Sequence, residues 1–141
     1  MTRKQRTRIL VESGEGLARQ LVEMVDSEEL KVISLTKPEE GLVMIQCRDG
    51  ALKTRFYLGE LLVTEAKVQI NGHIGIGYVR GRHHAWAKDL AIIDALFNQN
   101  HQITLEWKKS LERAEITLAK QEKVRSQKIL ATKVDFQTMA E

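Results

Sequence analysis

The feature that most constrains the fold is a C-terminal segment without glycine or proline, which runs from Gln102 to about Ala131. Its apolar residues recur at helical spacing and predict one long helix. About thirty residues at ~1.5 Å each span about 45 Å, whereas a compact domain of about 100 residues has a radius of gyration near 13 Å. Such a helix should project beyond the rest of the chain, and residues 132–141 are expected to follow it as a tail.

The long helix carries a narrow apolar stripe between many charged side chains. The stripe comprises Ile103, Trp107, Leu111, Ala114 and Leu118. Charges elsewhere on such a helix usually form a solvated surface. A projecting helix with an apolar seam is also typical of docking on a partner. We therefore expect Trp107, Leu111 and Leu118 at a partner interface, with an ordinary solvated helix as the alternative.

A second helix, predicted from His83 to Asn98, is apolar around most of its circumference. Trp86 and Leu90 lie on one stripe, and Ile92 and Leu96 lie on a neighbouring one. One sheet can cover only one side of such a helix. The second cover is either the long helix or another subunit, so Trp86, Ile92 and Leu96 are further candidate partner contacts.

Between two helical zones, residues 29–80 read as an antiparallel sheet of about five strands. Strands are expected at 31–36, 42–47, 54–57, 62–70 and 74–79, with turns at Lys37–Gly41, Asp49–Gly50 and Asn71–Gly72. Residues 1–28 are expected to be helical, with Ser13 capping a second helix, and residues 83–131 form the two later helices. The prediction is an α+β fold in a single domain, residues 1–141.

Composition excludes several classes of protein. The 22 Lys and Arg against 19 Asp and Glu give a net charge of only +3, which is weak support for a nucleic-acid partner. The basic cluster Arg3, Lys4, Arg6 and Arg8 is either a solvated chain end or an arm that docks on an anion. No apolar run has the length of a membrane span, no leader pattern follows the basic start, and Cys47 is the sole cysteine. A cytoplasmic protein is the expectation.

The segment where the last strand meets the helix is the best candidate for a binding site. Arg80-Gly81-Arg82 precedes the predicted helix N-terminus, and helix N-terminal amides attract phosphate groups. The glycine spacing matches neither a Walker A loop nor a dinucleotide fingerprint. Either Arg80, Gly81 and Arg82 contact phosphate, or the glycines of this segment allow close packing and Arg82 is structural.

No residue pattern predicts catalysis or metal binding by this chain. The adjacent histidines His83 and His84 diverge on a helix, so we expect surface or capping roles for them. Cys47 is expected to be buried and inert. Asp94 stands on the apolar helix, and because an unpaired buried carboxylate is costly, we expect it to pair with an arginine or a backbone amide.

Several segments together resemble one family. The run from Gly77 to Arg82, followed by Ala87, Ala91 and Ile93-Asp94-Ala95-Leu96, is similar to the PhnG family of the carbon–phosphorus lyase core complex. The matching segments elsewhere are Glu40–Gln46, Phe56–Glu60 and Val134–Met139. They occur in the family's order and span the chain from Glu40 onward.

The resemblance implies a subunit of a cytoplasmic assembly that breaks down phosphonates. With the H and I subunits and an ATP-binding-cassette-type L subunit, the family takes part in displacing adenine from ATP by a phosphonate, which gives ribose 1-phosphonate 5-triphosphate. The J subunit cleaves the carbon–phosphorus bond with an iron–sulfur cluster and S-adenosylmethionine. The implied partners are the H, I and J subunits and a second copy of this chain. ATP is a substrate of the complex, and no cofactor or metal is expected here.

This chain departs from the family pattern at two positions. His83 stands where the family commonly has Asp, and Trp86 stands where it commonly has His. A ligand or proton-transfer role therefore does not carry over to Trp86, and we expect a positioning subunit without catalysis of its own. The resemblance adds Asp135, Phe136 and Met139 to the expected partner contacts. The alternative is phosphate binding by Arg80 and Arg82, and a small basic nucleic-acid-binding domain is the alternative of another class.

Overall fold

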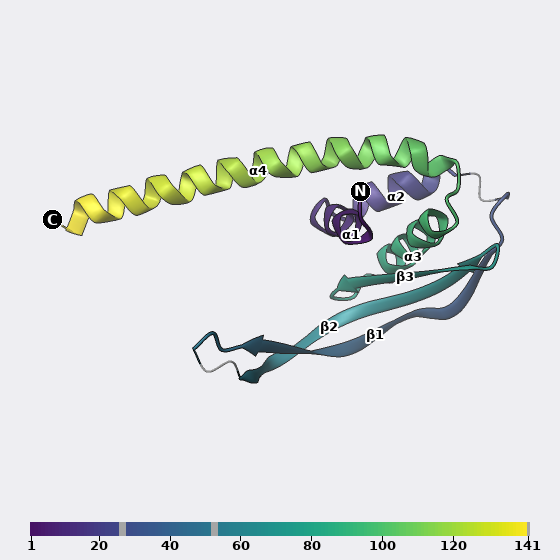
Figure 1. The fold of residues 1–141 in the computed structure, drawn as a ribbon, viewed down its shortest axis with the longest axis horizontal. Coiled ribbons are helices and arrows are strands. Elements are labelled where there is room, and N and C mark those ends of the chain that lie inside the picture. The colour runs from purple at the N-terminus through teal and green to yellow at the C-terminus, as the bar shows by residue number, and fades with distance from the viewer. Residues whose placement is uncertain (26–27, 52–53, 141) are drawn as a thin grey trace.

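The computed structural model describes residues 1–25, 28–51 and 54–140, with residues 133–140 described by their backbone alone. Four helices and a three-stranded antiparallel sheet make up this part of the chain, which confirms the α+β class (Figure 1). The elements in order are α1 (Arg3–Glu12), α2 (Glu15–Glu23), β1 (Val32–Arg48), β2 (Arg55–Ile70), β3 (His73–Arg80), α3 (His84–Asn98) and α4 (Ile103–Ala140).

The sheet has the order β1-β2-β3, and the prediction of about five strands is wrong. The predicted turn at Lys37–Gly41 lies inside the continuous strand β1. Shifts of register between Ser34 and Glu39 absorb the irregular backbone there. Pro38 is tolerated because β1 is an edge strand, whose outward amide needs no partner in the sheet.

The two remaining turns were predicted correctly. Asn71 and Gly72 both have positive φ, of 50° and 80°, and join β2 to β3, as a tight hairpin requires. At the other end of β2, the backbone N–H of Asp49 donates to the carbonyl of Thr54 at 2.8 Å, beside the predicted Asp49–Gly50 turn. Residues 52 and 53 of that connection lie outside the described residues.

The helices cover one face of the sheet (Figure 1). Along β2 the buried residues Thr64, Ala66, Val68 and Ile70 alternate with half-buried ones, which is the pattern of a sheet with one packed face. Helix α3 lies on β2 and β3, and α2 lies on α3. Helix α2 is therefore a second cover of α3, and the Phe97 ring of α3 meets the Trp107 ring of α4 with centroids 6.0 Å apart.

Two glycines of β3 allow α3 to approach the sheet closely. A Cβ atom on Gly75 would lie 2.0 Å from the carbonyl oxygen of Ala91, and one on Gly77 would lie 2.1 Å from that of Ala87. Neither contact is sterically allowed, so both positions require glycine. This confirms the packing interpretation for the glycines of this strand.

The ends of the helices differ from the prediction. Thr2 and Gln5 form a capping box at the start of α1, whereas Gly14 precedes α2 without a side-chain cap and Ser13 ends α1. The predicted tail is also wrong, because α4 continues through residue 132 to Ala140. In the part of the chain that the structure describes, no helix is long and apolar enough to cross a membrane.

Candidate functional site

A buried threonine fixes the corner between β3 and α3. Gly81 has φ of 84° and its N–H donates to the carbonyl of Leu62 at 2.8 Å. The hydroxyl of Thr64 donates to the carbonyl of Gly81 at 2.5 Å and accepts from the N–H of His83 at 3.1 Å. The backbone of Gly81 is therefore held from both sides. Neither Thr64 nor its role was predicted, because the sequence does not show which β2 residue faces this corner.

Two of the cationic or imidazole side chains at this corner already lie beside a carboxylate. His84 Nε2 lies 2.8 Å from Glu40 Oε1, and Arg82 Nε lies 3.8 Å from the same oxygen. The hydrogen bond from His84 is the main cause that lowers the pKa of Glu40. Arg80 and Arg82 are both exposed. The structure therefore brings Arg80, Gly81 and Arg82 together, but with a carboxylate from β1 beside them.

His83 and Trp86, which follow Arg82 at this corner, make packing contacts. The rings of His83 and Trp86 meet edge to face with centroids 5.4 Å apart. The indole Nε1 of Trp86 is buried without a hydrogen-bond partner. Trp86 is partly buried against the core, so the geometry fits the packing role that its sequence context favoured.

Asp94 is buried and accepts four hydrogen bonds. Arg3 donates to it through Nε at 3.0 Å and Nη2 at 2.6 Å, Arg6 donates at 2.9 Å, and the N–H of Ile76 donates at 3.0 Å. Arg6 also lies 4.1 Å from the centroid of the Phe97 ring, and burial lowers the pKa of its guanidinium. The expected pairing of Asp94 is confirmed.

The same cluster corrects the interpretation of the basic N-terminus. Arg3 and Arg6 both bind a carboxylate of their own chain, Arg6 with its side chain buried and Arg3 with its side chain 59% exposed, so this pair does not form an arm that docks on an external anion. Arg8 pairs with Glu12 at 3.1 Å and approaches Glu122 of α4 at 3.7 Å. These contacts fasten α1 to α3 and α4.

Most of the predicted partner contacts lie inside this chain. Leu96, Trp107 and Leu111 are fully buried and Ile92 is 7% exposed. Trp86 and Leu118 are partly buried against the core. The side chains of Asp135, Phe136 and Met139 lie outside the described residues. The sequence showed which helix faces are apolar, but not that α1 and α2 would cover them.

Uncovered apolar side chains gather instead on two projections. We call residues 41–48 of β1 and 55–61 of β2 the ribbon arm, and residues 119–140 of α4 the helix arm. Both extend to the same side of the molecule, beyond α1 and α3 (Figure 1). The large apolar residues of the ribbon arm that are exposed are Leu42, Val43, Met44, Ile45, Phe56, Tyr57 and Leu58. Leu42 is 65% and Met44 59% exposed.

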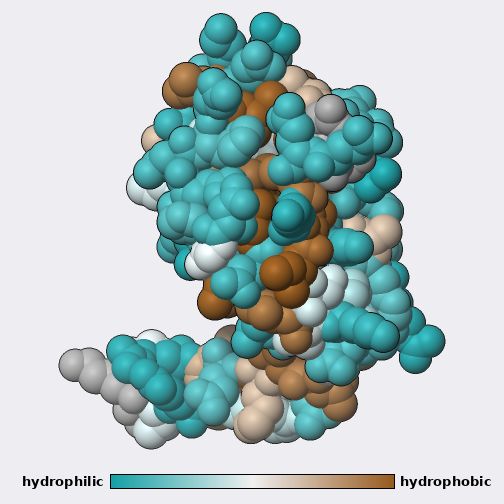
Figure 2. Space-filling model, turned by 90° about the vertical axis from the view of Figure 1, so that its right-hand side faces the viewer, coloured by the Kyte–Doolittle hydropathy of each residue, from teal (hydrophilic) through white to brown (hydrophobic). Residues whose placement is uncertain are grey.

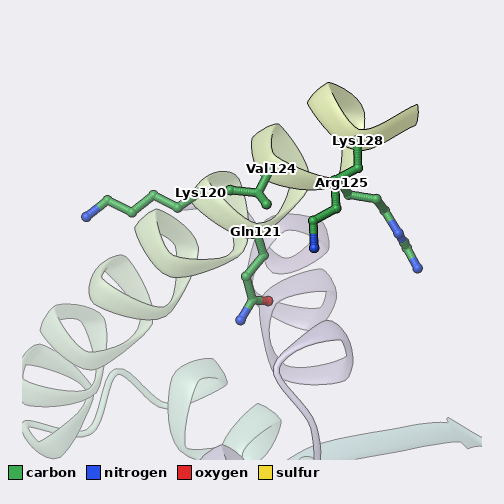
Figure 3. A pocket seen from close by; sticks show the side chains of 5 residues that line it. All are labelled: Lys120, Gln121, Val124, Arg125 and Lys128. Carbon is green, nitrogen blue, oxygen red and sulfur yellow. The ribbon is translucent and has the colours of Figure 1, made fainter. Parts of the chain in front are cut away.

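The helix arm combines apolar and cationic side chains. Val124, Ile129 and Leu130 are exposed on it. An open hollow of about 510 Å³ is lined by Lys120, Gln121, Val124, Arg125 and Lys128. In Figure 3 the Lys120 and Arg125 side chains point away from each other, so the cations do not converge on one position as a site for a small anion would require.

Hydrophobic surface also continues between the layers. Seen from the end opposite the arms, hydrophobic residues form a band through the middle of the molecule, with hydrophilic side chains over much of the part above it (Figure 2).

Among the described residues, no group of three or more His, Cys, Asp or Glu side chains could hold a metal ion. Cys47 is only partly buried, which corrects the expectation of a buried thiol.

The fold and its surfaces define an α+β protein whose helices cover one face of the sheet, with two projecting arms that expose large apolar side chains. The family described as "Phosphonate metabolism protein PhnG" matches residues 1–141. Over 139 residues the chain is 31% identical to a protein of Rhizobium meliloti (strain 1021) named "Alpha-D-ribose 1-methylphosphonate 5-triphosphate synthase subunit PhnG". That match covers 97% of this chain and 87% of the relative. The chain belongs to the PhnG family of phosphonate metabolism proteins, as the resemblance of its motifs predicted.

Proposed function

We propose that this chain is a structural subunit of an alpha-D-ribose 1-methylphosphonate 5-triphosphate synthase. Membership of the PhnG family and the name of the Rhizobium meliloti relative support the assignment. The reaction joins a phosphonate to the ribose of ATP with loss of adenine, so ATP is a substrate of the assembly. The chain positions its partners in the cytoplasm and supplies no metal or cofactor of its own.

The observation that carries this proposal is the pair of uncovered arms. A two-stranded ribbon is at best marginally stable in water by itself, and the ribbon arm has seven large apolar side chains exposed. Contiguous apolar surface of this kind marks an interaction site. The helix arm adds Val124, Ile129 and Leu130 on a helix that leaves the body of the molecule. The H, I and J subunits are the proposed partners, together with a second copy of this chain.

The chemistry available at the β3–α3 corner fits positioning better than catalysis. Removing adenine from ATP needs a group that moves a proton or holds the triphosphate. At the corner His84 and Arg82 both lie beside Glu40, at 2.8 and 3.8 Å, so these groups already have a partner within the chain. A second candidate role, contact of Arg80 and Arg82 with phosphate, is favoured by their exposure on either side of Gly81 at the start of α3.

Co-expression with the H, I and J subunits tests the structural role. Tagged full-length chain should co-purify with these subunits, and replacing Leu42 by Lys should abolish co-purification. Leu105→Lys is the matched control, because Leu105 is equally exposed (64% against 65%) but lies beside the body of the molecule. Retention of the partners by the Leu42→Lys variant would contradict the proposal for the ribbon arm.

Adenine release by the assembled complex with the L subunit separates the two candidate roles. A purely structural subunit predicts that Arg80→Ala and Arg82→Ala leave the rate within about twofold, as expected for surface changes outside a reacting site. A loss of activity from complexes that assemble normally would assign phosphate contact to this corner. Arg113→Ala, on the exposed surface of α4, is the control for removing a cation.

A further inference from the structure

The outer edge of the ribbon arm is unusual for a protein that stays in solution. In the described sheet, β1 is bonded on one side only, and β3 pairs with β2 from Val63 onward. Edge strands are normally protected by charges, proline or bulges. Residues 41–47 of β1 contain no charge, and Pro38 precedes them. The register shift between Ile45 and Gln46 places its extra residue, Leu58, on β2 and not on this edge. Such an edge can accept another strand through its free backbone groups.

The charges at the two ends of this stretch are complementary. At the tip, Arg48 pairs across the ribbon with Arg55, and like charges directly opposite are destabilising. In the part of the chain that the structure describes, neither arginine has an ion pair. At the base, Glu39 and Glu40 end the stretch with two carboxylates. The tip therefore lacks negative charge and the base carries it, where Glu40 also contacts His84 and Arg82 of its own chain.

We propose that β1 of a second copy of this chain adds to this edge in antiparallel orientation, centred on Met44. This register places Arg48 of each copy opposite Glu40 of the other, with Arg55 beside it. The uncharged residues between them then face each other, Val43 against Ile45. Parallel addition would instead place Glu40 beside Glu40 and Arg48 beside Arg48. The two ribbons become the four central strands of one continuous sheet.

A second copy is one of the partners proposed above. The pairing therefore rests on the proposed function, because both copies must occur in one assembly. A strand from a different subunit could satisfy the same backbone groups. The segment from Glu40 to Arg48, however, matches itself in charge when its direction is reversed, which favours a second copy of this chain. A different subunit on this edge is therefore the outcome that the experiment must distinguish.

Cross-linking tests the register in the full-length chain, both purified and co-expressed with the H, I and J subunits. The cysteine-free Cys47→Ser background receives Met44→Cys, and a short bismaleimide is added. A covalent dimer of this chain is expected, whereas Leu105→Cys, equally exposed on α4, should give none. Absence of the dimer, or equal dimer from both variants, overturns the proposal. Co-purification in the same samples shows separately whether the proposed function stands.

A charge exchange tests the antiparallel orientation. Glu40→Arg alone and Arg48→Glu alone should each weaken self-association about tenfold in sedimentation, because symmetry breaks two cross-strand pairs at once. The double variant restores opposite charges and should recover most of the loss. Circular dichroism confirms that each variant is folded. A double variant no better than the single ones, or a wild-type chain that stays monomeric, overturns the pairing.

Discussion

The body of this molecule buries and pairs charged side chains, whereas its two arms leave apolar side chains exposed. In the body, the buried carboxylate of Asp94 has four donors, and Asp89 is paired with Arg19 at 3.3 Å. In the ribbon arm, residues such as Leu42 and Met44 are more than half exposed. The body is therefore a closed core, whereas the arms leave large apolar side chains uncovered within this chain. Changes in the body should affect folding, and changes in the arms should affect assembly.

The largest loss of stability is expected from Asp94→Ala. This change leaves the buried guanidinium of Arg6 without its counterion, and removing one partner of a buried ion pair costs about 3–5 kcal/mol. The free energy of unfolding in urea should fall by this amount. Glu12→Ala, which breaks the exposed pair of Arg8 and Glu12 on α1, should change it by less than about 1 kcal/mol. Equal losses would show that the Asp94 cluster is not what joins α1 to α3.

A smaller loss of stability is expected from Gly77→Ala. The added Cβ would meet the backbone of α3 at Ala87, and overpacking of a core costs about 1–3 kcal/mol. Gly41→Ala is the matched control, because nothing lies within 4 Å of its added Cβ and its φ is not positive. Thermal unfolding of both variants tests the contact. A Gly77→Ala protein with unchanged melting would contradict the close approach of β3 and α3.

Phe56→Ser on the ribbon arm should leave the stability of the chain nearly unchanged but weaken its assembly with partners. Phe56 is 48% exposed, so the free energy of unfolding of the isolated chain should change by less than about 0.5 kcal/mol. Co-purification with the partner subunits should fall sharply, because the change removes apolar contact area. A variant that unfolds easily but still assembles would invert the assignment of body and arm.

The body was more predictable from sequence than the arms, and the reason is burial. Helical spacing located α3 because one buried face imposes its period, and the cost of an unpaired carboxylate predicted the partners of Asp94. Asn71–Gly72 was predictable because this dipeptide suits the turn's positive φ values. Each of these predictions rests on a local rule.

The strands at 42–47 and 54–57 and the turn between them were predicted, but not that each continues without a break into a longer strand or that the ribbon arm projects with its apolar side chains exposed. Residues 42–45 are apolar without alternation, and Pro38 with Gly41 resembles a turn until the edge position of β1 is known. The phosphate hypothesis for Arg80 and Arg82 could not include Glu40, which lies far away in sequence. The end of α4 was placed too early: no glycine or proline stands after residue 131, so nothing in the sequence ends the helix before Ala140.

The smallest expected effect is the pH dependence of stability that comes from Asp89, a buried carboxylate of the body. Burial raises the pKa of Asp89 above its usual 3.8, against the attraction of Arg19. Between these two pKa values the folded chain holds a proton that the unfolded chain has released. The contribution of Asp89 to stability is therefore lost as pH rises through this range. Asp89→Asn removes this dependence, so the stability of wild type relative to the variant should fall as pH rises from 4 toward 7, by less than about 1 kcal/mol.

Unfolding in urea at several pH values measures this difference, since acid effects shared by both proteins cancel. A change in the opposite direction would mean that the attraction of Arg19 outweighs the burial of Asp89. Arg19→Gln separates the two causes: it removes the attraction and should steepen the fall. The same series on the arm variant Phe56→Ser should match wild type at every pH, because the ribbon arm is remote from this carboxylate, and a changed slope there would show that body and arm fold as one unit.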